Sequence, residues 1–332
     1  MLWLANMRRV YRYLRSLARL VIDYAGDLWR FSVYNTSIKP EGCKRKLGAI
    51  IVRTAHGLEK AFSLPDVRLG FGSTNCHLLI ERCNIYIIKY GVDDIVSNAV
   101  GVLNYYRQYH IKHSFELEVS LTEKIEVLSA VARHVKTDSV SWGGVKTVKK
   151  SDILGIVLSF DFAAFANARS SVRSFGPGVI PHSYLKAAVN IAMKSPSVCN
   201  RRAWRVNMYQ GERLRKILEV QNGNRGFGHL LEQAVLIVGV LSSYSNQERN
   251  QVYIDGGLFA MSLIYALHSQ GIGTCPLNTA FSLSSSQKFR RAAGLRRDEV
   301  PIMIVGFGWL KEKYAVTVSP RADPDAIIRL VE

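Results

Sequence analysis

Apolar residues recur with the period of an α-helix through much of the first half of the chain. Two expected helix faces consist of Leu47, Ile50, Ile51, Ala55 and Leu58, and of Ile95, Val96, Ala99, Val100, Leu103 and Tyr106. Ser120 and Glu123 have the spacing of a capping box and predict the start of another helix. The stretch His56–Lys60 mixes polar side chains with a glycine and indicates a turn. The first half is therefore expected to be mostly helical.

Continuous runs of aliphatic residues characterise the second half. After a helix with Leu185, Ala188, Val189 and Ala192, the pattern predicts strands at Trp204–Tyr209, Ala234–Leu241, Pro301–Gly306 and Tyr314–Val318. Leu258–Leu267 is apolar on nearly every side, which predicts a helix covered by the core or by a second subunit. Periodicity is lost between Ser141 and Lys150, so we expect two regions, residues 1–160 and 161–332.

A basic amphipathic helix is expected between Met7 and Ile22. Its apolar positions are Val10, Leu14, Leu17, Ala18, Val21 and Ile22, and its basic positions are Arg8, Arg9, Arg12, Arg15 and Arg19. The segment lacks the continuous apolar core and the cleavage site of a signal peptide. Packing against its own domain is the favoured interpretation, and peripheral contact with the inner face of a membrane is the alternative.

Composition and charge narrow the classes of function. The chain has 332 residues, of which 48% are hydrophobic and 21% charged, which is typical of a globular protein. The net charge of +18 is shared evenly, because 23 basic and 14 acidic residues in 1–160 give +9, and 21 and 12 in 161–332 also give +9. A nucleic-acid-binding arm would concentrate this charge in one stripe, so we expect no nucleic acid and favour anionic ligands or surfaces.

Cysteine and histidine spacing points to neither a disulfide framework nor a metal site. The five cysteines form no C-x-x-C pair, and the eight histidines include no H-E-x-x-H motif. A reducing cytoplasm suits such a chain. The longest apolar stretch, Gly256–Leu267, is too short to span a bilayer, so a soluble or peripheral protein is expected.

Two polar segments of the second half could bind a phosphorylated heterocycle. Arg169–Phe175, with the sequence R-S-S-V-R-S-F, places two guanidinium groups and several hydroxyls within a few residues of each other, which suits a phosphate. Ser195–Trp204, S-P-S-V-C-N-R-R-A-W, lies between a helix and a strand, where its polar side chains could contact a ring or a polyol. Trp204 itself is expected in the core.

Two more segments complete the candidate set. Gly271–Asn278, G-I-G-T-C-P-L-N, follows the apolar helix, and its glycines could allow the backbone to approach a flat ligand closely or could simply end the helix. Arg321, near the C-terminus, could reach a phosphate or solvent.

In this order and spacing, the four segments resemble the nitroreductase family over about 165 residues, from Arg169 onward. The resemblance implies an α+β sandwich with a central, mainly antiparallel sheet flanked by helices, preceded here by the mostly helical region 1–160. It further implies an intertwined homodimer with two FMN sites at the subunit interface, and a ping-pong reaction in which NADH or NADPH supplies electrons for a small-molecule acceptor. The stretch His56–Lys60 is similar to one in long members associated with polysaccharide biosynthesis.

The resemblance also assigns roles to individual residues. By position, Arg169, Ser170, Ser171, Arg173 and Arg321 would bind the FMN phosphate and ribityl chain, Pro196, Ser197 and Asn200 would line the flavin ring, and Gly273 and Thr274 would face it from the other side. Arg202 is a further ring contact, at a position where the family has glutamine, and Ser170 replaces a frequent arginine. No protein side chain is expected to act as a catalytic nucleophile, and Cys275 is expected to be a wall residue.

Two other functions fit the same residues. The first is a flavin-dependent dehydrogenase that acts on one biosynthetic intermediate. The second is a flavin-free accessory protein that keeps the fold beside a polysaccharide assembly machine. Turnover of NADPH with a quinone would distinguish a general NAD(P)H-dependent reductase from the specialised dehydrogenase. A yellow colour of the purified protein would count against the flavin-free accessory protein.

Overall fold

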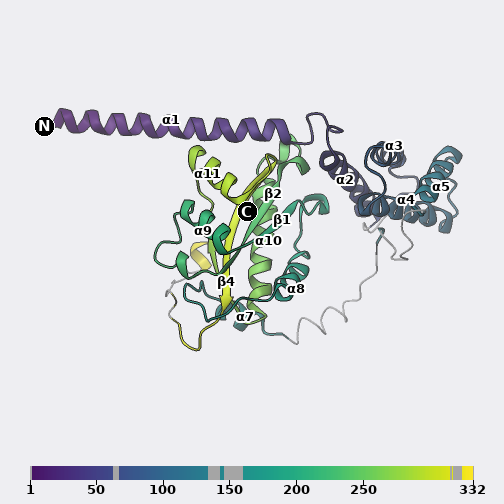
Figure 1. Ribbon diagram of the computed structural model, residues 1–332. Helices are drawn as coiled ribbons and strands as arrows, with labels where there is room; N and C mark the ends of the chain where they lie inside the picture. The colour runs from purple at the N-terminus through teal and green to yellow at the C-terminus, as the bar shows by residue number, and fades with distance from the viewer. Residues whose placement is uncertain are drawn as a thin grey trace.

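The computed structural model describes residues 2–62, 67–133, 143–145, 160–314, 316 and 324–331, and its N-terminal part is helical as the periodicity predicts. The helices are α1 (Leu2–Tyr34), α2 (Lys44–Phe62), α3 (Ser73–Tyr90), α4 (Asp94–Lys112) and α5 (Val119–Arg133). The N-terminal part of the long helix α1 projects from the rest of the chain, whereas α2 to α5 pack side by side (Figure 1). The chain therefore begins with one projecting helix and one helical bundle.

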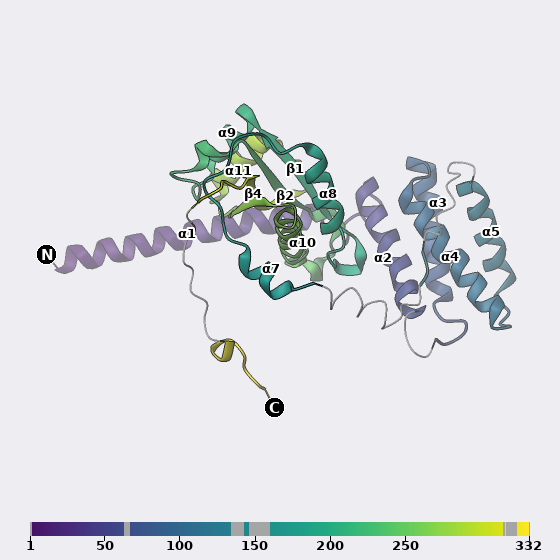
Figure 2. The same cartoon turned by 90° about the horizontal axis from the view of Figure 1, so that it is seen from below.

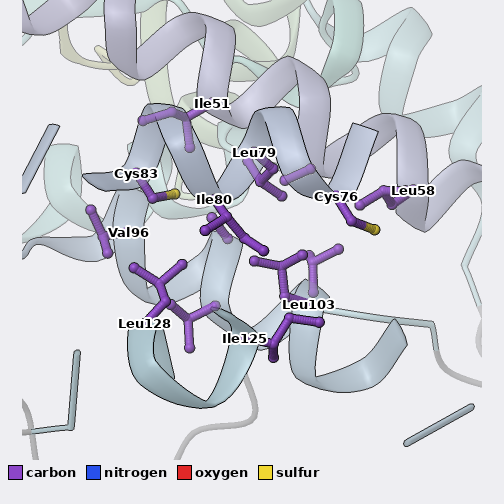
Figure 3. Packing of buried hydrophobic residues seen from close by; sticks show 14 of the residues in the cluster. Ile51, Leu58, Cys76, Leu79, Ile80, Cys83, Val96, Leu103, Ile125 and Leu128 are labelled. Atoms are coloured by element: carbon purple, nitrogen blue, oxygen red, sulfur yellow. The ribbon is translucent and has the colours of Figure 1, made fainter. Parts of the chain in front are cut away.

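The bundle of α2 to α5 has an apolar core of its own. Leu58 from α2, Leu79 from α3, Leu103 from α4 and Ile125 from α5 point toward one another and are buried (Figure 3). Around Phe62, the rings of Phe71, Tyr105, Tyr106 and Tyr109 lie 4.8–5.9 Å away between centroids, in edge-to-face geometry. This burial stabilises α2 to α5 as a bundle.

Two local predictions in this region are wrong. His56–Lys60 lies inside α2 and forms no turn, because Ala55 and Leu58 are buried in the bundle core and the helix continues through the glycine. The predicted capping box at Ser120 also fails, since α5 already begins at Val119 and the Ser120 hydroxyl bonds the Glu118 carboxylate.

The C-terminal part is built around a sheet, with helices on both faces. In chain order its elements are α7 (Phe162–Ala168), α8 (His182–Ala192), η1 (Val198–Asn200), β1 (Trp204–Gln210), α9 (Gly211–Val220), η2 (Gly228–Leu230), β2 (Gln233–Val240), η3 (Leu241–Ser243), η4 (Asn246–Glu248), α10 (Gln251–His268), β3 (Ile272–Leu277), α11 (Leu283–Ala293), β4 (Glu299–Trp309) and η5 (Pro324–Ala326). The strands of the described residues form one antiparallel sheet in the order β1-β2-β4-β3. This arrangement is the expected α+β sandwich.

Alternate side chains along the strands face two separate apolar cores. On one face, Val235, Ile237 and Phe307 pack against α8 and α10, with Trp204 stacked on Phe259 of α10 as the sequence predicts for a core tryptophan. On the other face, Leu236 and Ile304 pack against α9 and α11. The two layers of helices are visible on either side of the sheet in Figure 2.

The predicted strands at Trp204–Tyr209, Ala234–Leu241 and Pro301–Gly306 are confirmed as β1, β2 and β4. Gly273 and Thr274 do not belong to a glycine loop, because they lie in the strand β3. Gly271 alone in that segment has a positive φ, of 73°, at the turn that ends α10. The expected strand Tyr314–Val318 falls mostly outside the described residues, as does Arg321.

The segment between α1 and α2 joins the helical part of the chain to the sheet. Thr36 is buried, and both its backbone N–H and its hydroxyl donate to the carbonyl oxygen of Tyr244, at 2.7 and 3.1 Å. Arg45 pairs with Asp298 at 2.6 Å. The buried Lys46 ammonium donates to the carbonyl oxygens of Val33 and Ile38, so the end of α1 and the start of α2 are held together.

Within the described residues, no helix is long and apolar enough to cross a membrane. In the same part of the chain, no three histidine, cysteine, aspartate or glutamate side chains are grouped so that they could hold a metal ion.

Candidate functional site

The two arginines of R-S-S-V-R-S-F lie on an extended segment beside the edge strand β3. Ser171 forms a parallel bridge with Thr274, and the Val172 N–H donates to the Thr274 carbonyl oxygen at 2.9 Å. Val172 is buried and fixes the segment on the sheet, whereas Arg173 is exposed and Arg169, Ser170 and Ser171 are half-buried. The structure thus brings the predicted phosphate-binding residues next to Gly273 and Thr274. We call this group, Arg169–Arg173 with Gly273 and Thr274, the arginine half-site.

The charges of the arginine half-site are available to an anion. No carboxylate in the described part of the chain pairs with Arg169 or Arg173, and the guanidinium of Arg173 lies 6.0 Å from the centre of the Phe227 ring. Unpaired guanidinium groups beside two serine hydroxyls suit the oxygens of a phosphate monoester. The residues present therefore fit the phosphate end of FMN.

Close packing limits what Gly273 can contact. A Cβ at Gly273 would lie 2.8 Å from Leu310 Cδ2 and 3.2 Å from Val172 Cγ2, so side chains fill the space on that side of the glycine. Its neighbour Cys275 is buried, and this burial raises the pKa of the thiol, although the nearby Arg173 opposes the shift. A protonated, buried thiol is a wall residue, as the sequence predicts.

Lys311 is a cation that the sequence patterns did not single out. It follows the end of β4, and its ammonium donates to the Ser174 hydroxyl at 2.7 Å. Both residues line a cavity of ≈ 450 Å³ that is also bounded by Phe175, Gln233 and Phe307. In the sequence, the only indication that Lys311 could belong to the site is its position as the first cation after the long C-terminal strand. Lys311 adds a third cation at this end of the sheet.

The second predicted segment, S-P-S-V-C-N-R-R-A-W, forms a tight turn around η1. Cys199, Asn200 and Arg202 all have φ near +49°, a left-handed conformation that side chains disfavour. The Ser197 hydroxyl accepts from the Arg202 N–H at 2.9 Å and closes the turn. Pro196, Asn200 and Arg202 are exposed and Ser197 is half-buried, so the polar groups of the turn face outward. We call Pro196–Arg202 the turn half-site.

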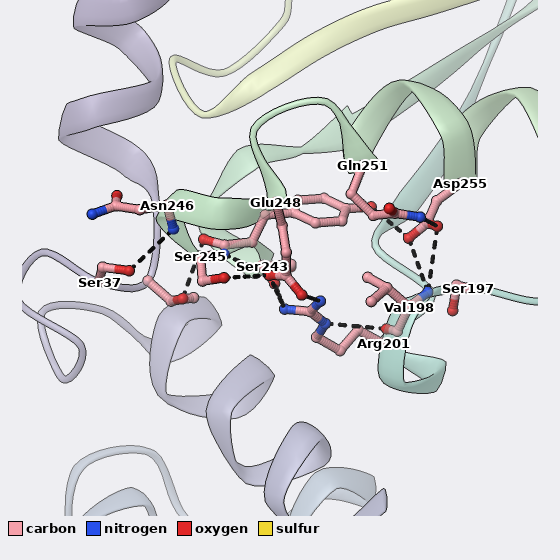
Figure 4. A network of polar contacts seen from close by, with 12 residues as sticks. Ser37, Ser197, Val198, Arg201, Ser243, Ser245, Asn246, Glu248, Gln251 and Asp255 are labelled. Atoms are coloured by element: carbon pink, nitrogen blue, oxygen red, sulfur yellow. Dashed lines mark hydrogen bonds and ion pairs between the residues drawn. The ribbon is translucent and has the colours of Figure 1, made fainter.

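A buried polar network holds the turn half-site against the start of α10 (Figure 4). The Val198 N–H lies 3.3 Å from both carboxylate oxygens of Asp255, which also accepts from Tyr244 and Gln251 at 3.0 and 2.8 Å. The Arg201 side chain is 1% exposed and forms a two-pronged ion pair with Glu248. Backbone strain in the turn is thus supported by partners from elsewhere in the chain.

The pKa of Glu248 reflects this network. Burial alone would raise the pKa of this carboxyl, but hydrogen bonds from Arg201 and from the backbone and hydroxyl of Ser245 outweigh burial and lower the pKa to about 2. Glu248 therefore stays charged at neutral pH, and because the two side chains bond each other, neither is free to bind a ligand. Arg201 is a positioning residue for the turn.

The two half-sites lie at opposite ends of the sheet within one chain. In the strand register, Trp204 comes shortly after the turn half-site and pairs with Gly239, which pairs with Val300. At the other end, Thr274 pairs with Phe307, and the same row continues through Gln233 to Gln210. Trp204 and Gln210 are the two ends of β1, which separates the levels by about 20 Å at roughly 3.3 Å per residue. One chain alone does not bring all the predicted residues to one ligand.

The helix α10 runs between the two half-sites and exposes an apolar stripe. Asp255, near its start, contacts the turn half-site, and His268, at its end, lies 3.2 Å from the carbonyl oxygen of Phe165 in α7, which precedes Arg169. Its residues Phe259, Leu263 and Leu267 are buried by the chain itself. Three others are 38–53% exposed on one side of α10, and we call them the α10 stripe: Ile254, Leu258 and Met261.

The comparisons with known proteins concern the C-terminal part of the chain. A family model described as the nitroreductase family matches residues 166–224 and 221–309. The comparison with curated proteins gave no match.

Several solved structures are similar in sequence and fold. A nitroreductase family protein from Streptococcus pneumoniae TIGR4 is 18% identical, with 52% of this chain and all of that chain covered and a TM-score of 0.45. A putative NAD(P)H:FMN oxidoreductase from Staphylococcus epidermidis is 20% identical, with coverages of 52% and 96% and a TM-score of 0.45. An FMN-dependent nitroreductase from Clostridium difficile R20291 is 18% identical, with coverages of 47% and 91% and a TM-score of 0.41.

Proposed function

Since residues 166–309 match the nitroreductase family, we propose that two copies of this chain form an FMN-dependent oxidoreductase that takes electrons from NADH or NADPH. The observation that carries this proposal is the division of the expected FMN site into two half-sites at opposite ends of the sheet. When bound, FMN would accept two electrons from the nicotinamide and deliver them to a small-molecule acceptor in a second, separate half-reaction.

The α10 stripe supports a particular geometry for the dimer. Leu258 lies near the middle of α10, so a two-fold axis through this region would pair α10 with a partner copy running in the opposite direction. The same rotation would place the turn half-site of each chain next to the arginine half-site of the other. A single symmetric contact would thus complete two equivalent sites and cover the exposed apolar residues.

Each half-site has a task in the complete site. Arg169, Ser170, Ser171 and Arg173 would bind the FMN phosphate and ribityl chain, together with Arg321, which lies outside the described residues. Lys311 would add positive charge at the same end. Pro196, Ser197, Asn200 and Arg202 would come from the second chain to contact the ring, and the apolar dimer interface would exclude water from it. An association with polysaccharide biosynthesis stays a prediction, because none of the three comparisons supports it.

Mixed dimers test this proposal directly. In one preparation, chains with Arg169→Ala are paired with chains carrying Asn200→Ala, using two affinity tags to isolate the heterodimer. If the site is shared between chains, one of its two sites is intact, and the heterodimer should bind one FMN per dimer with wild-type affinity while both parent homodimers bind weakly.

The matched control carries both substitutions on one chain and pairs it with a wild-type chain. The shared-site arrangement predicts that both sites of this control are damaged and that tight FMN binding is lost. The reverse pattern, with tight binding in the control and none in the first heterodimer, would show that each site is built within one chain and would refute the proposed dimer.

A further inference from the structure

The projecting half of α1 presents an apolar surface that the other described residues leave uncovered. Residues 6–19 are all exposed, and the helix first meets the sheet region at Asp23, which accepts a hydrogen bond from the Leu283 N–H at 2.5 Å. A Cβ at Gly26 would lie 2.8 Å from Leu283 Cδ1, so the contact with α11 is close. The favoured sequence interpretation, packing of Met7–Ile22 on its own domain, is therefore wrong.

Up to Arg30, the face that contacts the sheet region is the polar one, and beyond it Phe31 and Tyr34 pack on an apolar core cluster. Asp23, Gly26 and Arg30, spaced three and four residues apart, are half-buried against the body of the chain. Leu28 and Trp29 lie outside this contact face and are 70% and 62% exposed. Docking of α1 therefore directs its apolar face away from the body, even where the helix is in contact with it.

This apolar face continues along the projecting half of the helix. At about 100° per residue, its members cover nearly half of the helix circumference. They are Met7, Val10, Tyr11, Leu14, Leu17, Val21 and Ile22, and each is 43–65% exposed. We call these seven residues the α1 stripe. So many exposed large apolar side chains in one row indicate a binding surface.

The opposite face of the same segment carries charge of one sign. Arg8, Arg9, Arg12, Arg15 and Arg19 lie there, and no acidic residue occurs between Leu2 and Ile22. Two of them, Arg8 and Arg15, border the α1 stripe directly. A helix with an apolar face and an all-arginine polar face matches the requirements of an anionic lipid surface, where the apolar side chains enter the acyl region and the arginines meet the headgroups.

A second copy of the chain could instead cover the α1 stripe by forming a coiled coil. Apolar residues also follow a seven-residue repeat here, at Met7, Leu14, Val21 and Leu28. Helices that pair in this way carry charges of both signs beside the apolar seam. Between Met7 and Ile22, Tyr11, Tyr13 and Ala18 occupy the flanking positions, which widens the apolar face beyond a two-helix seam, and every charge in this segment is positive. The wide face and the uncompensated charge favour lipid.

We infer that residues Met7–Ile22 of α1 form a docking helix that lies flat on an anionic membrane surface and holds the oxidoreductase region beside it. The helix would lie in the headgroup layer, about 24 Å long at roughly 1.5 Å per residue. The polar contacts of Asp23 and Arg30 would keep the sheet region on the aqueous side.

Vesicle sedimentation with the full chain tests this inference. The protein should bind vesicles of phosphatidylcholine mixed with phosphatidylglycerol and bind pure phosphatidylcholine vesicles much more weakly. The double variant Leu14→Gln with Leu17→Gln keeps helix-forming side chains but should reduce binding by more than about tenfold, since two apolar side chains lose their lipid contacts. The double variant Arg8→Gln with Arg15→Gln should bind anionic vesicles about fivefold more weakly for each arginine lost. Added salt should also weaken the binding of wild type.

Ser16→Gln is the matched control, because Ser16 is exposed on the polar face and its replacement adds no charge. This variant should bind like wild type. Absence of preference for anionic vesicles would overturn the inference. The inference would also be overturned if the Leu14→Gln, Leu17→Gln variant bound vesicles normally but had a smaller mass than wild type in lipid-free solution. That result would mean that a second copy of the chain covers the α1 stripe. Circular dichroism of each variant confirms that the helix is retained.

Discussion

Arg201 and Glu248 show how a pair of residues can support a site without taking part in it. Arg201 belongs to the recognisable S-P-S-V-C-N-R-R-A-W segment, but its guanidinium is buried, and it bonds Glu248 and the carbonyl oxygens of Val198 and Ser243. The segment itself could be found from sequence. Its partner could not, because Glu248 is 47 positions away and its spacing from Ser245 marks only the start of a short helix.

Loss of this ion pair should destabilise the protein in a pH-dependent manner. Glu248→Gln leaves the buried Arg201 without its counter-charge, so the free energy of unfolding at pH 7 should fall by roughly 3 kcal/mol. Because the pKa of Glu248 is lowered in the folded state, wild type holds this advantage above pH ~4.5 and loses it as the pH falls toward about 2. Urea unfolding of both proteins at neutral and acidic pH measures the difference.

Glu212→Gln is the control for this measurement. Glu212 pairs with Lys216 on the exposed face of α9. Its replacement should leave unfolding unchanged within error at either pH. Equal stability of wild type and Glu248→Gln at pH 7 would mean that the ion pair does not support the turn.

The substitution Arg169→Ala tests the arginine half-site. The guanidinium of Arg169 has no carboxylate partner among the described residues, so Arg169→Ala should not unfold the domain. Binding of FMN should weaken by roughly 1.5–3 kcal/mol, the scale of a hydrogen bond to a charged group. Isothermal titration with FMN measures the loss, and Arg291→Ala, at an exposed position on α11, should bind as wild type does. Equal affinities for the two variants would remove Arg169 from the site.

At the scale of elements, the strongly periodic segments were predictable and the mixed ones were not. The strands β2 and β4 were evident because they are buried on both faces and almost purely aliphatic. The strand β3 was not, because its six residues include Gly273 and Pro276, which suggest a turn. An edge strand tolerates both, since one side of its backbone needs no partner.

The α10 stripe should determine the oligomeric state. Leu258→Glu places a charge in the middle of the proposed two-fold contact, so light scattering should show a monomer, and FMN binding should be lost with the dimer. Ile88→Glu is the control, because Ile88 is 85% exposed on α3 and far from α10 in the chain. A wild-type mass near 37.2 kDa, that of one chain, would contradict the dimer itself.

At the scale of the whole molecule, the resemblance implied FMN sites at a subunit interface, but the residues themselves did not show which segments lie at the same end of the sheet. The strand register places the two segments at opposite ends. The relation between the two regions was equally hidden. Residues 1–160 appeared independent, yet Thr36 and Arg45 contact Tyr244 and Asp298, which are over 200 positions away.

The central claim is that the dimer holds FMN where a reduced nicotinamide can reduce it. The most direct measurement is an anaerobic titration of the FMN-loaded full chain with NADH or NADPH, followed by the flavin absorbance near ~450 nm. We expect one FMN per chain and stoichiometric bleaching by at least one of the two nicotinamides, with the double variant Arg169→Ala and Asn200→Ala retaining no flavin. A chain that forms the dimer but binds no FMN, or binds FMN that neither nicotinamide reduces, would contradict the account.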